Sequence, residues 1–324
     1  MRLATLRSGG PDGQLIIVSK DALHGVSAQS VAPTLQAAVE NWTDMEPRLR
    51  TLSYALDQGS ADDVFALDPA ACGAPLPRAW QWLDASTYPS HAELMDKALG
   101  ITPEKFDRPM MYQGMSDHFY GPLDDIPMPD EALGIDFEGE FGIITDKVPM
   151  GVTVEQAQSH IKLLVQINDW SLRALAGTEM KSGFGWIQAK PACSMAPFAV
   201  TPDELGDAWS TWRPGLRLRV HWNGRVFGEA HGAPMAYGFD QLIAHAARTR
   251  QLAAGTVIGS GTVSNADFRE VGSSCIAERR GIEVVDEGRA RTPFMQFGDT
   301  VRMEASLPSG FSPFGTIEQK VVRA

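Results

Sequence analysis

Cysteine, long apolar runs and basic residues are all scarce in this chain. The three cysteines, Cys72, Cys193 and Cys275, are odd in number and widely spaced, which argues against a disulfide framework and against a CxxC zinc site. No stretch approaches the roughly 18 uncharged apolar residues of a membrane-spanning helix, and the first residues lack the apolar run of a secretory signal. These absences predict a cytoplasmic protein that has no membrane as a partner.

The charge balance is acidic. Asp and Glu number 40 against 28 Lys and Arg, so the formal net charge is −12 over 324 residues. Nucleic acids are bound by clustered Lys and Arg, and we therefore expect no nucleic-acid partner. Hydrophobic residues make up 44% of the chain and charged residues 21%, which is ordinary for a globular enzyme and argues against a disordered chain.

The pattern of apolar and turn-forming residues divides the chain into two domains. Residues 1–105 are expected to form a small α+β domain, with a hairpin of strands at 2–6 and 15–18 and a helix that begins after Thr34. Residues 106–324 read mainly as strands with few helices. This pattern predicts a β-rich α+β fold whose mixed sheet is rolled or packed as a sandwich.

Two local signals stand out in the second domain. Apolar and polar residues alternate over 216–222, and Asn223-Gly224 follows them, which predicts a hairpin. Thr153 and Gln156 form a capping-box pair, and the apolar residues after them recur at helical spacing as far as Asn168. A helix is therefore predicted over this second segment.

The most informative segment is Asp136-Phe137-Glu138-Gly139-Glu140. As a strand, it places Asp136, Glu138 and Glu140 on one face and the apolar residues on the other. Carboxylates about 4 Å apart in a cleft would repel by roughly 4 kcal/mol per pair at an effective dielectric of 20, and a divalent cation relieves that repulsion. From the pattern alone, a solvent-exposed acidic strand face is the alternative.

A third carboxylate, Asp169, stands in Asn168-Asp169-Trp170-Ser171. A set of oxygen ligands favours Mg²⁺, Mn²⁺ or Ca²⁺ over zinc. The alternative is an ordinary helix end at which Asp169 and Arg173 form an ion pair.

Three further segments carry polar groups that suit a cleft. The loop at 111–125 gathers acids, an imidazole and a phenol, although an Asp-His pair is more often structural. Lys190 ends a Gly-rich, aromatic loop, and a lysine that reaches a cleft neutralises an enolate or oxyanion. The run at 255–265 is rich in Gly and hydroxyls but lacks a phosphate-loop or dinucleotide fingerprint. It is interpreted as a contact to a carboxylate or carbonyl, with a tight turn as the alternative.

These motifs, in this order, resemble the fumarylacetoacetate hydrolase family: Asp136-Phe137-Glu138-Gly139-Glu140, Asn168-Asp169-Trp170-Ser171 with Arg173, Lys190-Pro191, and Gly261-Thr262-Val263-Ser264. The resemblance covers roughly residues 105–324, and the preceding part looks like the small N-terminal domain of bacterial two-domain members. It implies a mixed β-roll fold, a homodimer and a divalent cation, either Mg²⁺, Ca²⁺ or Mn²⁺.

The resemblance also implies roles for individual residues. Glu138, Glu140 and Asp169 match three metal ligands of the family. The fourth ligand of the family is an Asp from an upstream loop. Asp117 is chosen for it, although a direct alignment would put His118 at that position. The positions that hold substrate are Tyr120, Arg173, Lys190 and Thr262. Lys190 would in addition stabilise the oxyanion or carbanion.

The general base is less clearly assigned. Some members of the family use a His several residues past the loop Asp, oriented by a distant Glu, to activate water. In this chain the matching places fall near Asp124-Asp125 and near Ile276, with Glu278 close by. The base is therefore expected to be His118 or Asp124.

Together these features predict a metal-dependent hydrolase that cleaves a carbon–carbon bond in a small diketo acid. The metal would polarise a carbonyl, an activated water would add to it, and Lys190 would assist departure of the enolate. The alternative on the same fold is a decarboxylase, isomerase or hydratase of a 2-oxo acid. A non-catalytic β-rich module with a structural ion is the alternative from another class.

Overall fold

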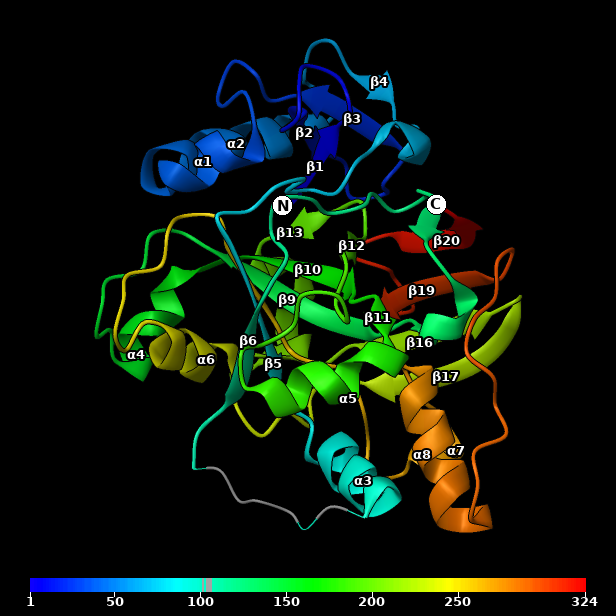
Figure 1. The fold of residues 1–324 in the computed structure, drawn as a ribbon. Helices are drawn as coiled ribbons and strands as arrows, with labels where there is room; N and C mark the ends of the chain where they lie inside the picture. The colour runs from blue at the N-terminus through cyan, green and yellow to red at the C-terminus, as the bar shows by residue number, and fades with distance from the viewer. Residues whose placement is uncertain (101, 103–106) are drawn as a thin grey trace.

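The computed structural model describes residues 1–100, 102 and 107–324. The domain boundary expected near residue 105 lies outside these residues. In Figure 1 the N-terminal strands and two helices form a separate layer at the top, above a larger body that holds the remaining elements.

The N-terminal layer follows its local sequence signals. The predicted hairpin is present, because β1 (Arg2–Leu6) pairs antiparallel with β2 (Gln14–Val18). The predicted helix is also present, and the Thr34 hydroxyl accepts a hydrogen bond from the Ala37 N–H at 3.1 Å as its N-cap. The helix breaks at Asn41, which divides it into two parts. The other elements of this layer are α1 (Leu35–Glu40), α2 (Trp42–Asp57), β3 (His24–Ser27) and β4 (Phe65–Ala66).

One large mixed sheet connects this layer to the rest of the molecule. Its eleven strands include β4-β3-β2-β1 at one edge, so the N-terminal strands continue into the central sheet. Most neighbours are antiparallel, but β5 and β18 are parallel and 170 or more residues apart in the chain. The strands that follow β1 are, in order, β13 (Ala199–Val200), β10 (Ile161–Asn168), β9 (Gly139–Thr145), β18 (Thr256–Gly259), β5 (Gln81–Ser86) and β6 (Met110–Gly114), and β12 (Ser194–Met195) pairs with β10.

The helix predicted from Thr153 to Asn168 is wrong over most of its length. The capping box forms as predicted, but α4 (Val154–Ala157) and a 3₁₀ turn, η3 (Gln158–His160), give way to strand β10. The run from Ile161 is mostly apolar and almost continuously buried, and it lies between β9 on one side and β12 and β13 on the other. Central strands that are buried on both faces show such runs, and here that pattern coincided with helical spacing.

A second sheet packs against the first to complete a strand-rich α+β fold. It has five strands, and the predicted hairpin at Asn223-Gly224 is confirmed, with positive φ angles of 50° and 74° that suit a two-residue turn. Apolar side chains from both sheets form one core, including Phe137, Phe141 and Val220. The strand order is β17 (Arg225–His231), β16 (Arg217–Trp222), β19 (Thr300–Ser306), β20 (Thr316–Arg323) and β7 (Ile126–Met128).

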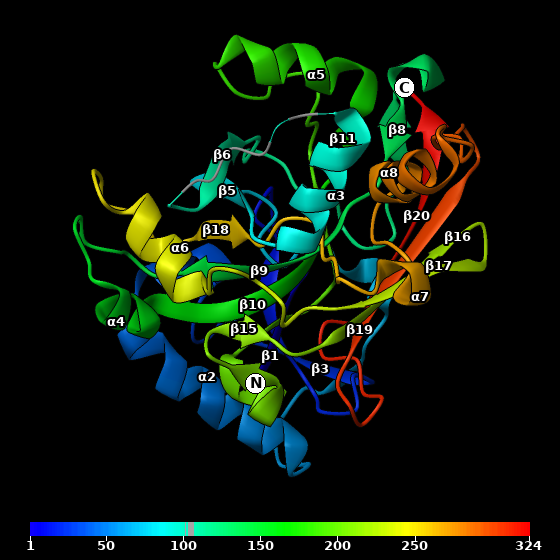
Figure 2. The same ribbon diagram turned by 90° about the horizontal axis from the view of Figure 1, so that it is seen from below.

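The helices of the larger body lie around the sheets. In both views α3 and α8 are neighbours, at the end opposite to the N-terminal layer in Figure 1 and beside α5 in Figure 2. A side chain at Gly281 of α8 would come within 3.2 Å of the Met95 sulfur of α3, so the glycine permits this close contact. Within the described residues, no helix is long and apolar enough to cross a membrane. The bounds are α3 (Pro89–Leu99), α5 (Arg173–Ser182), α6 (Phe239–Ala246), α7 (Phe268–Val271) and α8 (Ile276–Glu287).

Candidate active site

Three carboxylates from distant parts of the chain meet in the central sheet. Asp84 lies on β5, Glu140 on β9, and Asp169 directly after β10. One oxygen from each lies within 4.8 Å of the others. Strand β18 lies between β5 and β9 and brings their acids together. Its Gly259 pairs with Asp84 of β5 on one side and with Gly142 of β9, two residues after Glu140, on the other.

Gly259 also provides the space for this arrangement. A Cβ atom at Gly259 would lie 2.4 Å from an Asp84 oxygen and 3.0 Å from a Glu140 oxygen. Both distances are shorter than van der Waals contact, so any larger residue would push the carboxylates aside. We refer to Asp84, Glu140 and Asp169 as the acidic cluster.

The acidic cluster has the electrostatics of a cation site. All three residues are buried, and neither oxygen of Glu140 has a hydrogen-bond partner among the described residues. Burial, and then the charges of Asp84 and Asp169, raises the pKa of Glu140 well above its usual range. Burial, and then the charge of Asp169, raises the pKa of Asp84 to about 8. A divalent cation would satisfy these oxygens and offset their repulsion, and an all-carboxylate set suits Mg²⁺, Mn²⁺ or Ca²⁺.

Glu138 lies beside the acidic cluster but is engaged with cationic and hydroxyl groups. Lys190 Nζ is 3.1 Å from its Oε1 and only 2.5 Å from Asp169 Oδ2, so the ammonium bridges the two acids. Arg173 donates to the same Oε1, and the Thr262 hydroxyl donates to Oε2 at 2.7 Å. Burial alone would raise the pKa of Glu138. The pKa is nevertheless below its usual range, because Lys190, Arg173, the Thr262 hydroxyl and His91, in decreasing order of effect, stabilise the charged carboxylate.

Asp136 has a separate structural position. It belongs to the short strand β8 (Ile135–Asp136), which ends before β9 begins, so the acidic segment is not one continuous strand. Its carboxylate accepts from Arg173 Nε at 2.8 Å and from the Ile276 and Ala277 N–H groups at 2.7 and 2.9 Å. Asp136 thus binds the first turn of α8 and orients the Arg173 guanidinium.

Asp169 is held on both of its oxygens. The Tyr112 hydroxyl donates to Oδ2 at 2.7 Å, alongside Lys190, and the Cys193 thiol donates to Oδ1 at 2.9 Å. Burial, and then the charge of Asp169, raises the pKa of Cys193 well above its usual range, so the sulfur remains a protonated donor. Tyr112 and Cys193 were not identified from the sequence.

An imidazole and a carboxylate lie close together in the first turns of α3 and α8. His91 Nδ1 is 3.7 Å from Glu278 Oε1, which is beyond hydrogen-bond distance, and has no hydrogen-bond partner among the described residues. Glu278 is fully buried, and Ser264 donates to the same Oε1; the Ser264 hydroxyl is in turn 2.8 Å from the Ser90 hydroxyl. His91 is partly open to solvent. The pair lies near the acidic cluster, because Ser264, which contacts Glu278, follows two residues after Thr262, which contacts Glu138. We call His91 and Glu278 the His–Glu pair.

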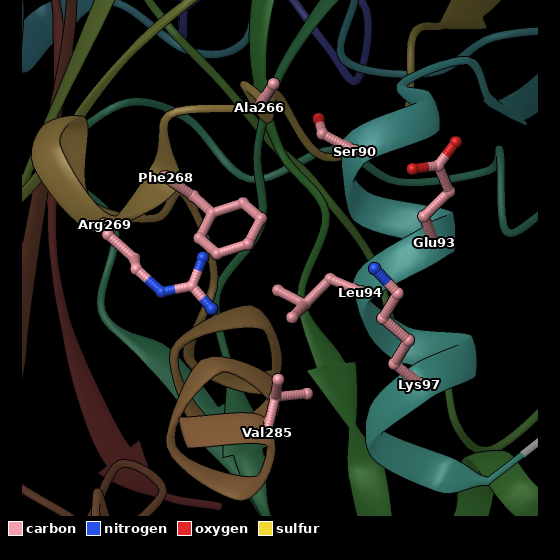
Figure 3. A pocket seen from close by; sticks show the side chains of 8 residues that line it. All are labelled: Ser90, Glu93, Leu94, Lys97, Ala266, Phe268, Arg269 and Val285. Carbon is pink, nitrogen blue, oxygen red and sulfur yellow. The ribbon is translucent and has the colours of Figure 1, made fainter.

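A hollow of about 230 Å³ opens next to the His–Glu pair, between α3 and the α7–α8 segment. Figure 3 shows the side chains that line it, with the aromatic ring of Phe268 facing Leu94 and the Ser90 hydroxyl at the upper end. Lys97 and Arg269 add two cationic groups, but Arg269 is already paired with Asp286 at 2.6 Å. The hollow therefore has a mixed lining, with apolar side chains such as Leu94 and Phe268 beside the charged groups of Glu93 and Lys97.

Three of the residues expected in the site lie elsewhere. Asp117, His118 and Asp124 line a different hollow of about 300 Å³ beside the N-terminal layer. Asp117 and His118 are exposed, and Asp124 Oδ1 is 2.7 Å from Arg7 Nη2. The structure does not bring any of them into the acidic cluster, where Asp84 supplies the upstream carboxylate. Tyr120 is half-buried, and its backbone pairs with the segment after Lys190, its N–H donating to the Cys193 carbonyl at 2.8 Å.

The sequence contained a weak signal for Asp84 and His91, two site residues that were not predicted from it. Asp84 is an acid within the otherwise mostly apolar stretch 82–85, and His91 follows seven positions later. That spacing agrees with a His several residues past the upstream Asp. Pro75, Pro77 and Pro89 flank strand β5 and make it hard to recognise from the sequence.

Comparison with known proteins establishes the relationship. Residues 81–322 match the family described as fumarylacetoacetate (FAA) hydrolase C-terminal, and residues 1–78 match fumarylacetoacetase N-terminal domain 2. The chain belongs to the fumarylacetoacetate hydrolase family. The family resemblance and the fold class predicted from the sequence are therefore both confirmed.

Relatives within this family carry several activities. The chain is 23% identical over 273 residues to oxaloacetate tautomerase fahd2, mitochondrial, of Xenopus laevis, covering 81% of this chain and 79% of the relative. It is 27% identical over 157 residues to 2,4-didehydro-3-deoxy-L-rhamnonate hydrolase of Sphingomonas sp. (strain SKA58), covering 48% of this chain and about half, 52%, of that relative. The family therefore includes hydrolases and tautomerases of keto acids.

Solved structures share the whole fold. Maleylpyruvate hydrolase from Sphingobium sp. SYK-6, in complex with manganese (II) ion and pyruvate, has a TM-score of 0.67 at 16% identity, with both chains fully covered. Fumarylacetoacetate hydrolase from psychrophilic Exiguobacterium antarcticum has a TM-score of 0.68 at 18% identity, again with both chains fully covered. At these identities the similarity concerns the fold.

Proposed function

We propose that this enzyme is a divalent-metal-dependent hydrolase that cleaves a carbon–carbon bond in a small diketo acid of the fumarylacetoacetate or acylpyruvate type. The observation that carries the proposal is the His–Glu pair near the acidic cluster. Hydrolysis needs a base that takes a proton from water, whereas decarboxylation of a 2-oxo acid needs none. A buried carboxylate that orients a partly open imidazole suits this role.

We propose Asp84, Glu140 and Asp169 as the metal ligands, with Glu138 as the neighbouring fourth acid. When it is bound, the divalent cation supplies a Lewis acid that polarises a substrate carbonyl. The buried, unpartnered oxygens of Glu140 support this assignment. Asp117 is not needed for the set, since Asp84 provides the upstream acid.

His91 would act as the general base and Glu278 as its orienting partner. His91 Nδ1 lies 3.7 Å from Glu278 Oε1 without a hydrogen bond between them; once Nδ1 donates to this carboxylate, the Nε2 atom is free to take a proton from water. The resulting hydroxide adds to the acyl carbonyl carbon, and the bond from this carbon to the adjacent methylene breaks. The electron pair moves into the enolate of the departing oxo acid, which is then protonated by the imidazolium. The products are a carboxylic acid and an oxo acid, which is pyruvate from an acylpyruvate and acetoacetate from fumarylacetoacetate.

Lys190 and its neighbours would stabilise the charge that develops. The Lys190 ammonium already lies between two acids, at 3.1 and 2.5 Å, so it can donate to an enolate oxygen that arrives at the same place. Arg173 and Thr262, which both contact Glu138, are proposed to hold the substrate carboxylate. The phenol at this site is Tyr112, which contacts Asp169, rather than Tyr120.

The hollow beside the His–Glu pair is proposed to receive the acyl end of the substrate. Ser90 lines it, and His91 is the next residue of the same helix. Because the base must stand next to the carbonyl that water attacks, the group attached to that carbonyl extends past His91. Leu94 and Phe268 would contact the hydrocarbon part of the acyl group, while Glu93 and Lys97 lie in the same lining.

A substrate comparison tests the proposal. Purified protein with Mn²⁺ or Mg²⁺ is supplied with acylpyruvates, fumarylacetoacetate and oxaloacetate, while loss of diketo absorbance and release of pyruvate or acetoacetate are measured. We expect turnover of at least one diketo acid, which is lost with EDTA. Conversion of oxaloacetate without turnover of any diketo acid would overturn the hydrolase.

Oxaloacetate tautomerisation is the second candidate function. The Xenopus laevis relative that covers most of the chain carries this name. Tautomerisation also needs a proton-transfer group, and His91 would serve it. The enol–keto absorbance change of oxaloacetate distinguishes it from hydrolysis because no carbon–carbon bond is broken.

A further inference from the structure

We propose that Cys193 is a positioning residue, whose thiol fixes the orientation of the Asp169 carboxylate and thereby raises the affinity of the acidic cluster for a divalent cation. The inference rests on the metal site of the proposed function, and it concerns cation binding rather than turnover.

Strand register places the thiol where it can act on Asp169. In the pairing of β10 with β12, Ile167 stands opposite Met195 and Asn168 opposite Ser194. The next step of the same register puts Asp169 across from Cys193. The Cys193 carbonyl accepts from the Tyr120 N–H at 2.8 Å, so the backbone that carries the thiol is itself anchored.

The contact is specific to one oxygen of Asp169. The sulfur lies 2.9 Å from Oδ1, whereas Tyr112 and Lys190 occupy Oδ2. Cys193 is 1% exposed, so no water reaches Oδ1 from this side. Without the thiol donor, the carboxylate would lose the contact that sets its rotation.

An independent feature indicates that this rotation matters for a ligand. Both Glu140 oxygens are buried without a hydrogen-bond partner among the described residues, and they face the same cluster as Asp169. A cation must be shared by Asp84, Glu140 and Asp169, and its affinity depends on how well their oxygens are prearranged. Donors that orient metal-ligating carboxylates typically change metal affinity about 10- to 100-fold when they are removed.

Substitutions at this position separate the hydrogen bond from packing. Cys193→Ala removes the donor and leaves a small void, Cys193→Val removes the donor but fills the volume, and Cys193→Ser retains a donor. Cys72→Ala is the matched control, because Cys72 is also fully buried but packs beneath the N-terminal layer and its backbone carbonyl contacts Arg7.

The experiment measures cation affinity directly. The full chain is stripped with EDTA, dialysed and titrated with Mn²⁺, and free Mn²⁺ is followed by electron paramagnetic resonance; thermal midpoints in EDTA report folding. We expect Kd to rise about 10- to 100-fold for Cys193→Ala and Cys193→Val. The serine variant and Cys72→Ala should remain within about threefold of the unsubstituted protein.

Two results would overturn the inference. One is an unchanged Mn²⁺ affinity in a folded Cys193→Val variant. The other is a loss in Cys193→Ser as large as in Cys193→Ala, because the hydrogen bond would then not be the cause. Neither result bears on the proposed hydrolase activity. That proposal is tested separately, and it is wrong if the Mn²⁺-loaded, unsubstituted protein turns over no diketo acid.

Discussion

Replacing Asp84 with Asn should stabilise the metal-free protein at alkaline pH, and a divalent cation should reduce this advantage. Asp84 is buried, and burial and the charge of Asp169 raise its pKa to about 8. Asn has the same shape as a protonated Asp and keeps the oxygen that accepts from the Gly261 N–H at 3.2 Å. The substitution therefore removes the ionisation of Asp84 with little change in packing.

The direction of the pH effect follows from this raised pKa. A carboxyl whose pKa is higher in the folded state than in the unfolded state favours folding while it is protonated. In EDTA, the contribution of Asp84 is therefore fully present below its unfolded pKa of about 3.9 and is lost as the pH rises through about 8. Each pKa unit corresponds to about 1.4 kcal/mol, so the loss from this one group is on the order of 5 kcal/mol at most.

Thermal unfolding at two pH values gives the assay. In EDTA at pH 5, which lies only about one unit above the unfolded pKa, the unsubstituted protein should unfold slightly below Asp84→Asn. At pH 9 in EDTA, the unsubstituted protein should unfold several degrees below the variant. Excess Mn²⁺ at pH 9 should narrow this difference, because a cation present at 100 times its Kd adds about 2.7 kcal/mol to the unsubstituted protein, whereas the variant lacks one ligand.

The thermal midpoints test both the strain of the metal-free cluster and the role of Asp84 as a ligand. A metal-free, unsubstituted protein that is as stable as Asp84→Asn at pH 9 would refute the claim that the acidic cluster is strained without a cation. Failure of Mn²⁺ to raise the midpoint of the unsubstituted protein more than that of Asp84→Asn would refute the assignment of Asp84 as a ligand.

The remaining predictions concern separate parts of the site. Lys190→Met should retain Mn²⁺ binding and lose about 10²- to 10³-fold in kcat, and a normal kcat would remove the lysine from the reaction. His91→Asn should lower kcat about 10²- to 10⁴-fold with unchanged Mn²⁺ affinity; unchanged turnover would exclude it as the base. Gly259→Ala should destabilise the protein by about 1–3 kcal/mol and weaken Mn²⁺ binding, which calorimetry would detect. Leu94→Trp should reduce kcat/KM for long acylpyruvates more than for acetylpyruvate, and an equal reduction would argue against the acyl hollow.

Much of the fold could be predicted because its signals are local. A hairpin of adjacent strands, an N-cap at Thr34 and a turn at Asn223-Gly224 each depend on a few consecutive residues, and all three are present. The helix predicted after Thr153 failed because apolar spacing does not distinguish a buried strand from a helix in a short run. What decided for a strand was the presence of β9 and β12 on either side of it.

The candidate site, like the fold, was predicted from the sequence only in part. The motifs around Glu140, Asp169 and Lys190 were recognisable in the sequence, and the structure brings these three residues together. The upstream acid was placed at Asp117, whereas Asp84 occupies that position in the cluster. Asp84 arrives there through parallel pairing of β5 with β18, whose residues are far apart in the chain.

The sequence by itself determined the family, the strand-rich fold class and the residue types of the site, because these are recorded in composition, in short-range periodicity and in motif order. Only the tertiary structure decided which acids share a cluster, which cysteine contacts Asp169 and which histidine faces Glu278. These contacts depend on the register between strands and helices more than 20 residues apart. Such a register is set by packing of the whole core, and no local pattern encodes it.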